Sequence, residues 1–200
     1  LGICATNCYT VVDTETKEAL IIDPADRADV LIRDWKEKGV TPQAVLLTHG
    51  HFDHIGALAG VKKEYPDIKV YAAAEEKEVR ESPALNLSSS FGAAFTAQAD
   101  IYLEDGAEIE VLGRTCKCLL VPGHTKGGMC YYFPEENVVF TGDTLFCYSV
   151  GRTDFPKGSA SVLIRGIKEK LLPLPDEVTV YTGHNDTTTI GTERRYNPYL

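Results

Sequence analysis

The sequence lacks any apolar run approaching the roughly 20 residues that cross a bilayer. No basic, hydrophobic leader precedes Leu1, so we expect a cytoplasmic protein that does not insert into membranes. Basic residues are also few, since 20 Lys and Arg against 29 Asp and Glu give a formal net charge of −9. This charge argues against nucleic acid or an anionic lipid surface as the main partner and suits divalent cations.

Paired cysteine motifs are scarce as well. Of six cysteines, only Cys116 and Cys118 form a C-x-C pair, and no second pair completes a Cys-rich zinc site. A chain of 200 residues buries enough apolar surface to fold without disulfides. We therefore expect reduced, mostly buried thiols, with this pair on one face of a strand. Linkers, repeats and low-complexity segments are absent too, so residues 1–200 are expected to form one domain.

The segments that are present alternate between short strands and amphipathic helices. Two β-rich runs at 8–13 and 18–23, joined by a polar turn, predict a hairpin. Apolar residues at helical spacing predict helices, and the region 109–141 predicts a second, antiparallel sheet. This order favours an α+β fold with two facing sheets and helices outside. Strands are expected at 44–48, 69–72, 109–115, 117–121, 129–133, 138–141 and 178–181, and helices at 28–38, 55–65, 75–81 and 161–172.

Histidine is rare, yet every one of the five histidines lies in a segment that directly follows an apolar strand. Residues 48–54 read THGHFDH and hold four potential metal ligands, while three later segments each add one ligand beside a glycine. Imidazole suits zinc, iron or manganese, and carboxylates suit the harder of these ions. The seven ligands divide into two groups of three with one shared carboxylate, which predicts a dinuclear metal site. They are His49, His51, Asp53, His54, His124, Asp143 and His184.

These segments, with TNCY at 6–9, IDP at 22–24, GRTDF at 151–155 and NPYL at 197–200, resemble metallo-β-lactamase-fold hydrolases. Within that superfamily the chain is similar to the short bacterial glyoxalase II-like proteins. The resemblance implies a four-layer αββα sandwich with the metals at one edge between the sheets. It also implies that the first metal is bound by His49, His51 and His124, the second by Asp53, His54 and His184, and both by Asp143.

The resemblance further implies a thioester hydrolase with two divalent ions, zinc first and iron or manganese as alternatives. A bridging water whose pKa falls to about 7 would supply hydroxide as the nucleophile. The substrate class would be S-lactoylglutathione or a related hydroxyacyl thioester. Asp53 is the expected catalytic residue that orients the water and takes its proton. Arg152 stands where relatives carry a basic residue that helps bind glutathione, and the alternative for it is a structural salt bridge.

Metal-bound imidazoles need their second ring nitrogen held by an oxygen. The candidates for this task are Asp23, Thr48 and Thr144, although Asp23 in an Asp-Pro turn could equally do no more than end a strand. Residues 82–99 contain no charged side chain. This segment is expected either to wall the substrate cleft or to pack against the body of the protein.

Four other functions remain to be weighed. A persulfide dioxygenase shares several of these segments and would bind one iron through His49, His124 and Asp143. A non-catalytic metal-binding module is disfavoured by the complete ligand set. β-Lactam hydrolysis is disfavoured because no secretory leader precedes Leu1 and because His54 stands where many lactamases carry arginine. A nuclease is disfavoured by the net charge of −9.

Overall fold

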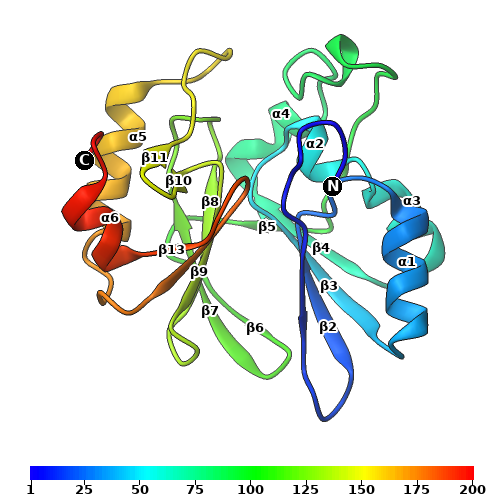
Figure 1. Cartoon of the computed structure of the whole chain (residues 1–200). Coiled ribbons are helices and arrows are strands. Elements are labelled where there is room, and N and C mark those ends of the chain that lie inside the picture. Colours follow the sequence, from blue (N-terminus) through cyan, green and yellow to red (C-terminus); the bar gives the residue numbers. More distant parts are fainter.

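The computed structural model describes residues 1–200 and contains two β-sheets that face each other, with helices on their outer faces (Figure 1). In the first sheet, β1 and β2 form the predicted antiparallel hairpin, and the remaining neighbours are parallel. Its strands in spatial order are β1 (Tyr9–Val12), β2 (Glu18–Ile22), β3 (Thr41–Leu47), β4 (Lys69–Ala73) and β5 (Ile101–Leu103).

The second sheet is mixed. Its neighbouring strands are antiparallel except for β9 and β12, which run parallel. A separate small hairpin joins β10 (Leu145–Phe146) to β11 (Ser149–Val150). In spatial order the sheet contains β13 (Thr188–Thr189), β12 (Thr179–Thr182), β9 (Val138–Gly142), β8 (Met129–Phe133), β7 (Arg114–Leu120) and β6 (Glu108–Val111).

Helices α1 (Ala28–Glu37) and α3 (Leu58–Glu64) cover the first sheet, and α5 (Ala160–Gly166), which continues as a π-helix over Ile167–Leu171, covers the second together with α6 (Ile190–Tyr196) (Figure 1). Strand β2 shows why four layers form. Its Ala19 and Ile21 pack with Trp35 beneath the helices, whereas Leu20 and Ile22 pack against the other sheet. Apolar side chains on both faces of a strand require cover on both faces. The predicted αββα sandwich is therefore confirmed.

Short helical segments lie at the edge of the sandwich where the loops after β3 and β4 emerge. They are α2 (Phe52–Ile55), the 3₁₀ turn Ala74–Glu76 followed by α4 (Lys77–Arg80), and the 3₁₀ turn Ser88–Ser90. None of the helices has the length and apolar character needed to cross a bilayer.

The strand boundaries predicted at 109–115 and 117–121 are wrong. The chain turns at Leu112 and Gly113, which both adopt positive φ angles of 50° and 67°, so residues 114–120 form one strand. All six cysteines are free, and Cys116 and Cys118 both face the core between the sheets as predicted, but only Cys116, Cys118 and Cys130 are buried, so burial of most of the thiols was overestimated. Strand β5, the hairpin β10–β11, β13 and helix α6 were not predicted.

Candidate metal centre

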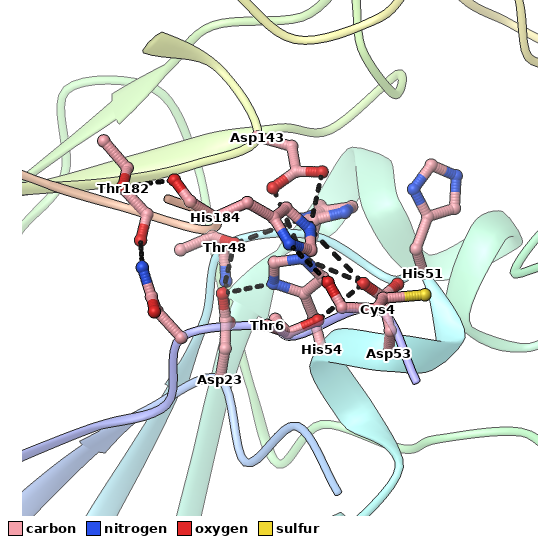
Figure 2. A network of polar contacts seen from close by, with 12 residues as sticks. Cys4, Thr6, Asp23, Thr48, His51, Asp53, His54, Asp143, Thr182 and His184 are labelled. Atoms are coloured by element: carbon pink, nitrogen blue, oxygen red, sulfur yellow. Dashed lines mark hydrogen bonds and ion pairs between the residues drawn. The ribbon is translucent and has the colours of Figure 1, made fainter. Parts of the chain in front are cut away.

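The predicted ligand segments all lie at one edge of the sandwich. The histidine-rich segment follows β3, and the segments with His124, Asp143 and His184 follow or end β7, β9 and β12. These last three strands run in the same direction, so their carboxyl ends reach the same edge of the second sheet. The two sheets thus bring four separate segments together, and Figure 2 shows the side chains of Asp53, His54, Asp143 and His184 close to one another.

The ligand atoms form two compact groups. One group contains His49, His51 and His124, and the other contains Asp53, His54 and His184; within each group the atoms lie within 4.8 Å of one another. Asp143 lies between the groups. Its Oδ2 is 3.5 Å from His124 Nε2 and 3.4 Å from His184 Nε2, and its Oδ1 is 3.4 Å from His54 Nε2. The structure thus brings together the same two groups of residues that the resemblance implies, with Asp143 between them.

Asp23 orients two of the histidines. Its buried carboxylate lies 2.8 Å from His54 Nδ1 and accepts hydrogen bonds from the Thr48 backbone N–H at 2.7 Å and the Thr48 hydroxyl at 2.6 Å (Figure 2). The Thr48 hydroxyl oxygen in turn lies 3.1 Å from His49 Nδ1. Asp23 therefore does more than end a strand. Thr144, predicted for the same task, forms no hydrogen bond with any of the histidines; its backbone N–H donates to the Thr141 carbonyl.

Backbone carbonyls hold two further histidines, an arrangement that the sequence did not reveal. The carbonyl oxygen of Arg152 lies 2.7 Å from His124 Nδ1, and that of Cys4 lies 3.1 Å from His184 Nδ1. With Nδ1 held in this way, Nε2 of His124 and Nε2 of His184 face Asp143 Oδ2 at 3.5 and 3.4 Å. A carbonyl belongs to every residue, so its role here depends on the path of the backbone and carries no signal in the side-chain sequence.

Three buried polar atoms of the cluster have no hydrogen-bond partner: His49 Nε2, His54 Nε2 and Asp143 Oδ1. Leaving such atoms unsatisfied costs free energy, and native proteins rarely do so without a ligand or a functional reason. These atoms are nitrogen and carboxylate donors that face inward from both groups, which is the donor set that divalent transition metals prefer. The residues therefore fit a pair of metal ions.

The cluster strongly shifts the pKa values of its own members. Burial lowers the pKa of His49 well below its usual range and that of His51 to about 3, so both rings are neutral donors at neutral pH. Burial opposes the charge of His54, but Asp143 and Asp53 raise its pKa well above the usual range. Because metal ligands must be deprotonated, an ion bound by His54 displaces a proton.

A cavity of about 410 Å³ opens onto the ligands. Its wall includes Phe52, Phe91, Phe146 and Phe155, and Phe155 lies edge-on to His51 with ring centroids 5.3 Å apart. Arg152 also lines it, with its guanidinium 4.0 Å above the Phe155 ring and paired with both oxygens of Asp154 at 2.7 and 2.6 Å. Arg152 thus makes the structural salt bridge and also borders the cleft. The Cys4 thiol, which the sequence reasoning missed, lies in the same wall.

The uncharged segment 82–99 divides between its two expected roles. Leu87 and Phe91 line the cavity, and Phe91 stacks on Phe52 with centroids 4.7 Å apart and planes 13° apart. Phe95 instead packs with the buried Ala97 against the core beneath the first sheet. The first half therefore walls the cleft, and the second half is anchored to the body.

Two known proteins are similar to nearly the whole of the chain. The chain is 38% identical over 202 residues to the probable metallo-hydrolase YqgX of Bacillus subtilis, covering 100% of this chain and 94% of that protein. It is 37% identical to the hydroxyacylglutathione hydrolase GloC of Haemophilus influenzae, covering 97% of this chain and 92% of that protein.

Three solved structures are similar over nearly the whole chain. BLEG-1 B3 metallo-beta-lactamase has a TM-score of 0.94 and 41% identity, covering 100% of this chain and 96% of that one. TTHA1623 in a di-iron-bound form has a TM-score of 0.88 and 37% identity, covering 100% of this chain and 98% of that one. ETHE1 from Myxococcus xanthus has a TM-score of 0.79 and 30% identity, covering 98% of this chain and 79% of that one.

The family model that matches this chain is that of the metallo-beta-lactamase superfamily, over residues 1–184. That range includes every predicted metal ligand. The match confirms the resemblance seen in the sequence motifs, and the chain belongs to the metallo-beta-lactamase superfamily.

Proposed function

We propose that the chain is a metal-dependent hydrolase that cleaves a thioester, either S-lactoylglutathione or a related hydroxyacyl thioester. The observation that carries this proposal is the pair of three-ligand groups sharing Asp143 at a cavity of about 410 Å³. The similarity to the hydroxyacylglutathione hydrolase GloC supports a thioester as substrate.

Two ions would be held by these two groups, one by His49, His51 and His124 and the other by Asp53, His54 and His184, and Asp143 lies where it would serve both. When bound, two divalent ions supply Lewis acidity and lower the pKa of a water molecule toward about 7. The similarity to a di-iron protein supports two metals in this chain. Zinc or iron suits the nitrogen-rich donor set.

Asp53 is the proposed catalytic residue. The Thr6 hydroxyl donates a hydrogen bond to Asp53 Oδ2 at 2.8 Å, which fixes the carboxylate beside His184 (Figure 2). The neighbouring His54, together with the hydrogen bonds from His184 and Thr6, lowers the pKa of Asp53 to about 2 against the opposing effect of burial. An ionised carboxylate held in one orientation accepts a hydrogen bond from the attacking water and orients it, and we assign to the same carboxylate the transfer of the proton that the water loses.

The cavity wall supplies binding. Phe52, Phe91 and Phe155 present apolar surface that displaces water from a bound substrate. Arg152 lies at the same wall with an exposed guanidinium, which suits recognition of a substrate carboxylate. Because Asp154 already pairs with this guanidinium, the substrate carboxylate competes with Asp154 for Arg152.

The direct test measures hydrolysis of S-lactoylglutathione by metal-loaded protein with and without oxygen. We expect the same rate in both conditions. The matched variants His51→Ala and Asp143→Ala are each expected to lose turnover and bound metal together. Full activity in either variant, or no cleavage of any hydroxyacyl thioester by the loaded protein, would contradict the proposal.

β-Lactam hydrolysis is the second candidate. Sequence reasoning disfavoured it, but the 41% identity and TM-score of 0.94 with a B3 metallo-beta-lactamase favour it. A chromogenic cephalosporin assayed beside the thioester separates the two activities by their kcat/KM values. Uptake of oxygen with glutathione persulfide, in protein holding one iron, would instead indicate the dioxygenase chemistry considered from the sequence.

A further inference from the structure

Glu76 is a buried carboxylate that the metal centre and the cavity do not use. It ends the 3₁₀ turn after β4 and is only 1% exposed. One of its oxygens, Oε1, accepts a hydrogen bond from the Gly50 backbone N–H at 2.8 Å. The other oxygen, Oε2, accepts one from the Gly127 backbone N–H at 2.7 Å. A single side chain therefore contacts two loops that belong to different sheets.

Both of these loops carry ligands of the same metal group. Gly50 lies between His49 and His51, and Gly127 follows His124 by three positions. At the base of the loops, the backbone N–H of Met129 also donates to the Thr48 carbonyl at 2.8 Å. The Met129–Thr48 hydrogen bond alone would let the two loops rotate about it. The bridge through Glu76 lies nearer the histidines and fixes the distance between the two loops.

The packing around Glu76 shows that this bridge is tightly built. A Cβ atom added at Gly127 would lie 2.4 Å from the backbone nitrogen of Glu76. A Cβ atom added at Gly50 would lie 2.7 Å from Cγ of Arg80, four residues further along the same segment. Neither contact leaves room for a side chain. The segment Ala74–Arg80 thus lies directly against the backbone of both ligand loops.

A carboxylate is the group that this arrangement requires. Both oxygens accept hydrogen bonds from N–H donors, whereas an amide of the same size offers only one oxygen and turns an NH₂ group toward the other donor. Burial raises the pKa of Glu76, while the N–H groups of Gly50 and Gly127 and the charge of Arg80 lower it in opposition. Burying a carboxylate costs free energy. A buried carboxylate that bridges two ligand loops therefore indicates a role beyond filling space.

We propose that Glu76 is a positioning residue that sets the separation of the two loops and thereby the geometry and affinity of the metal site formed by His49, His51 and His124. Glu76 contacts neither the substrate cavity nor a ligand side chain. Its role is therefore the same whichever substrate the protein hydrolyses.

The test compares zinc affinity in the Glu76→Gln variant and in the unchanged protein, by competition with a chromophoric chelator. We expect the zinc affinity of the site formed by His49, His51 and His124 to fall about 10–100-fold, as it does when other residues that orient metal ligands are replaced. With saturating zinc, kcat should fall while KM stays close to that of the unchanged protein. In metal-free protein, hydrogen exchange at the Gly50 and Gly127 amides should become faster.

Glu193→Gln is the matched control. Glu193 is equally buried and also bonds two parts of the chain, accepting from the Thr188 hydroxyl and the Tyr148 backbone N–H, but neither part carries His49, His51 or His124. This variant should lower the melting temperature and leave zinc affinity unchanged. The Glu76→Asp variant keeps the charge but is too short to reach both loops, and it should also weaken zinc binding. Unchanged zinc affinity in both folded Glu76 variants, or an equal loss in Glu193→Gln, would overturn the proposal.

Discussion

At the scale of single residues, the metal centre depends on which nitrogen each imidazole leaves free. Four of the five rings have Nδ1 held by an oxygen, and the holders differ in kind: a carboxylate, a hydroxyl and two backbone carbonyls. Holding Nδ1 fixes the ring orientation and directs Nε2 at the metal. The ring orientations are thus set within the protein's own hydrogen-bond network. His51 is the exception, because its Nδ1 faces His124 Nε2 at 3.0 Å.

Replacing Asp23 tests this network directly. The Asp23→Ala variant removes the acceptor for His54 and Thr48 together, and we expect metal affinity to fall about 10–100-fold. Asp26→Ala is the control, because Asp26 is an exposed carboxylate in the same turn. Metal content after dialysis against a weak chelator measures the effect. Equal metal retention in the two variants would show that Asp23 does not orient the ligands.

The residues that gather at the candidate metal centre were predictable from the sequence, but many of the hydrogen bonds that hold them were not. His49, His51 and His54 stand in a dense motif, and chemistry alone restricts what such a motif can bind. Asp23 was a candidate because its residue type can accept an N–H bond. Other contacts join segments that are far apart in the chain, so no local sequence pattern predicts them. They are the hydrogen bonds of the Cys4 and Arg152 carbonyls and the bridge through Glu76.

At the scale of elements, the ligands converge because their strands end at one edge. This convergence was implied by apolar strands followed by ligand and glycine residues. The exact strand limits were less predictable: a single glycine marks the two-residue turn at Leu112 and Gly113, where positive φ angles reverse the chain between Val111 and Arg114. Two-residue strands such as β10 and β13 have too few residues to show any periodicity.

The segment 82–99 offers a matched pair of variants for separating binding from packing. Phe91 is 54% exposed and lines the cavity, so Phe91→Ala should raise KM severalfold with little change in melting temperature. Phe95 packs against the core, so Phe95→Ala should lower the free energy of unfolding by about 1–3 kcal/mol, less than a fully buried phenylalanine would. Steady-state kinetics and thermal melts measure both. An unchanged KM in Phe91→Ala would remove this residue from the substrate wall.

At the scale of the whole molecule, the candidate metal centre lies between the two halves of the sandwich. The first sheet carries His49, His51, Asp53 and His54, and the second carries the remaining three ligands. The net charge of −9 includes Asp53 and Asp143, whose charge two divalent ions would offset. An anionic substrate would then be attracted by the metals and Arg152 although the molecule as a whole is acidic.

Metal removal should therefore destabilise the whole fold. An ion that binds only the folded state contributes about 2.7 kcal/mol at 100 times its dissociation constant. For a chain of this length, roughly 2–4 °C of melting temperature corresponds to each kcal/mol, so chelation should lower the melting temperature by about 5–10 °C. Calorimetry of the loaded and stripped protein measures the change. Coinciding melting curves would mean that the ions do not link the two sheets.

The most direct test of the central claim is an anaerobic titration of metal-free protein with zinc, following S-lactoylglutathione hydrolysis against the number of ions bound per chain. The two-group geometry predicts that activity reaches its maximum at two bound ions and is unchanged when oxygen is admitted. Maximal activity with one bound iron and a requirement for oxygen, or no thioester cleavage at two bound ions, would contradict it.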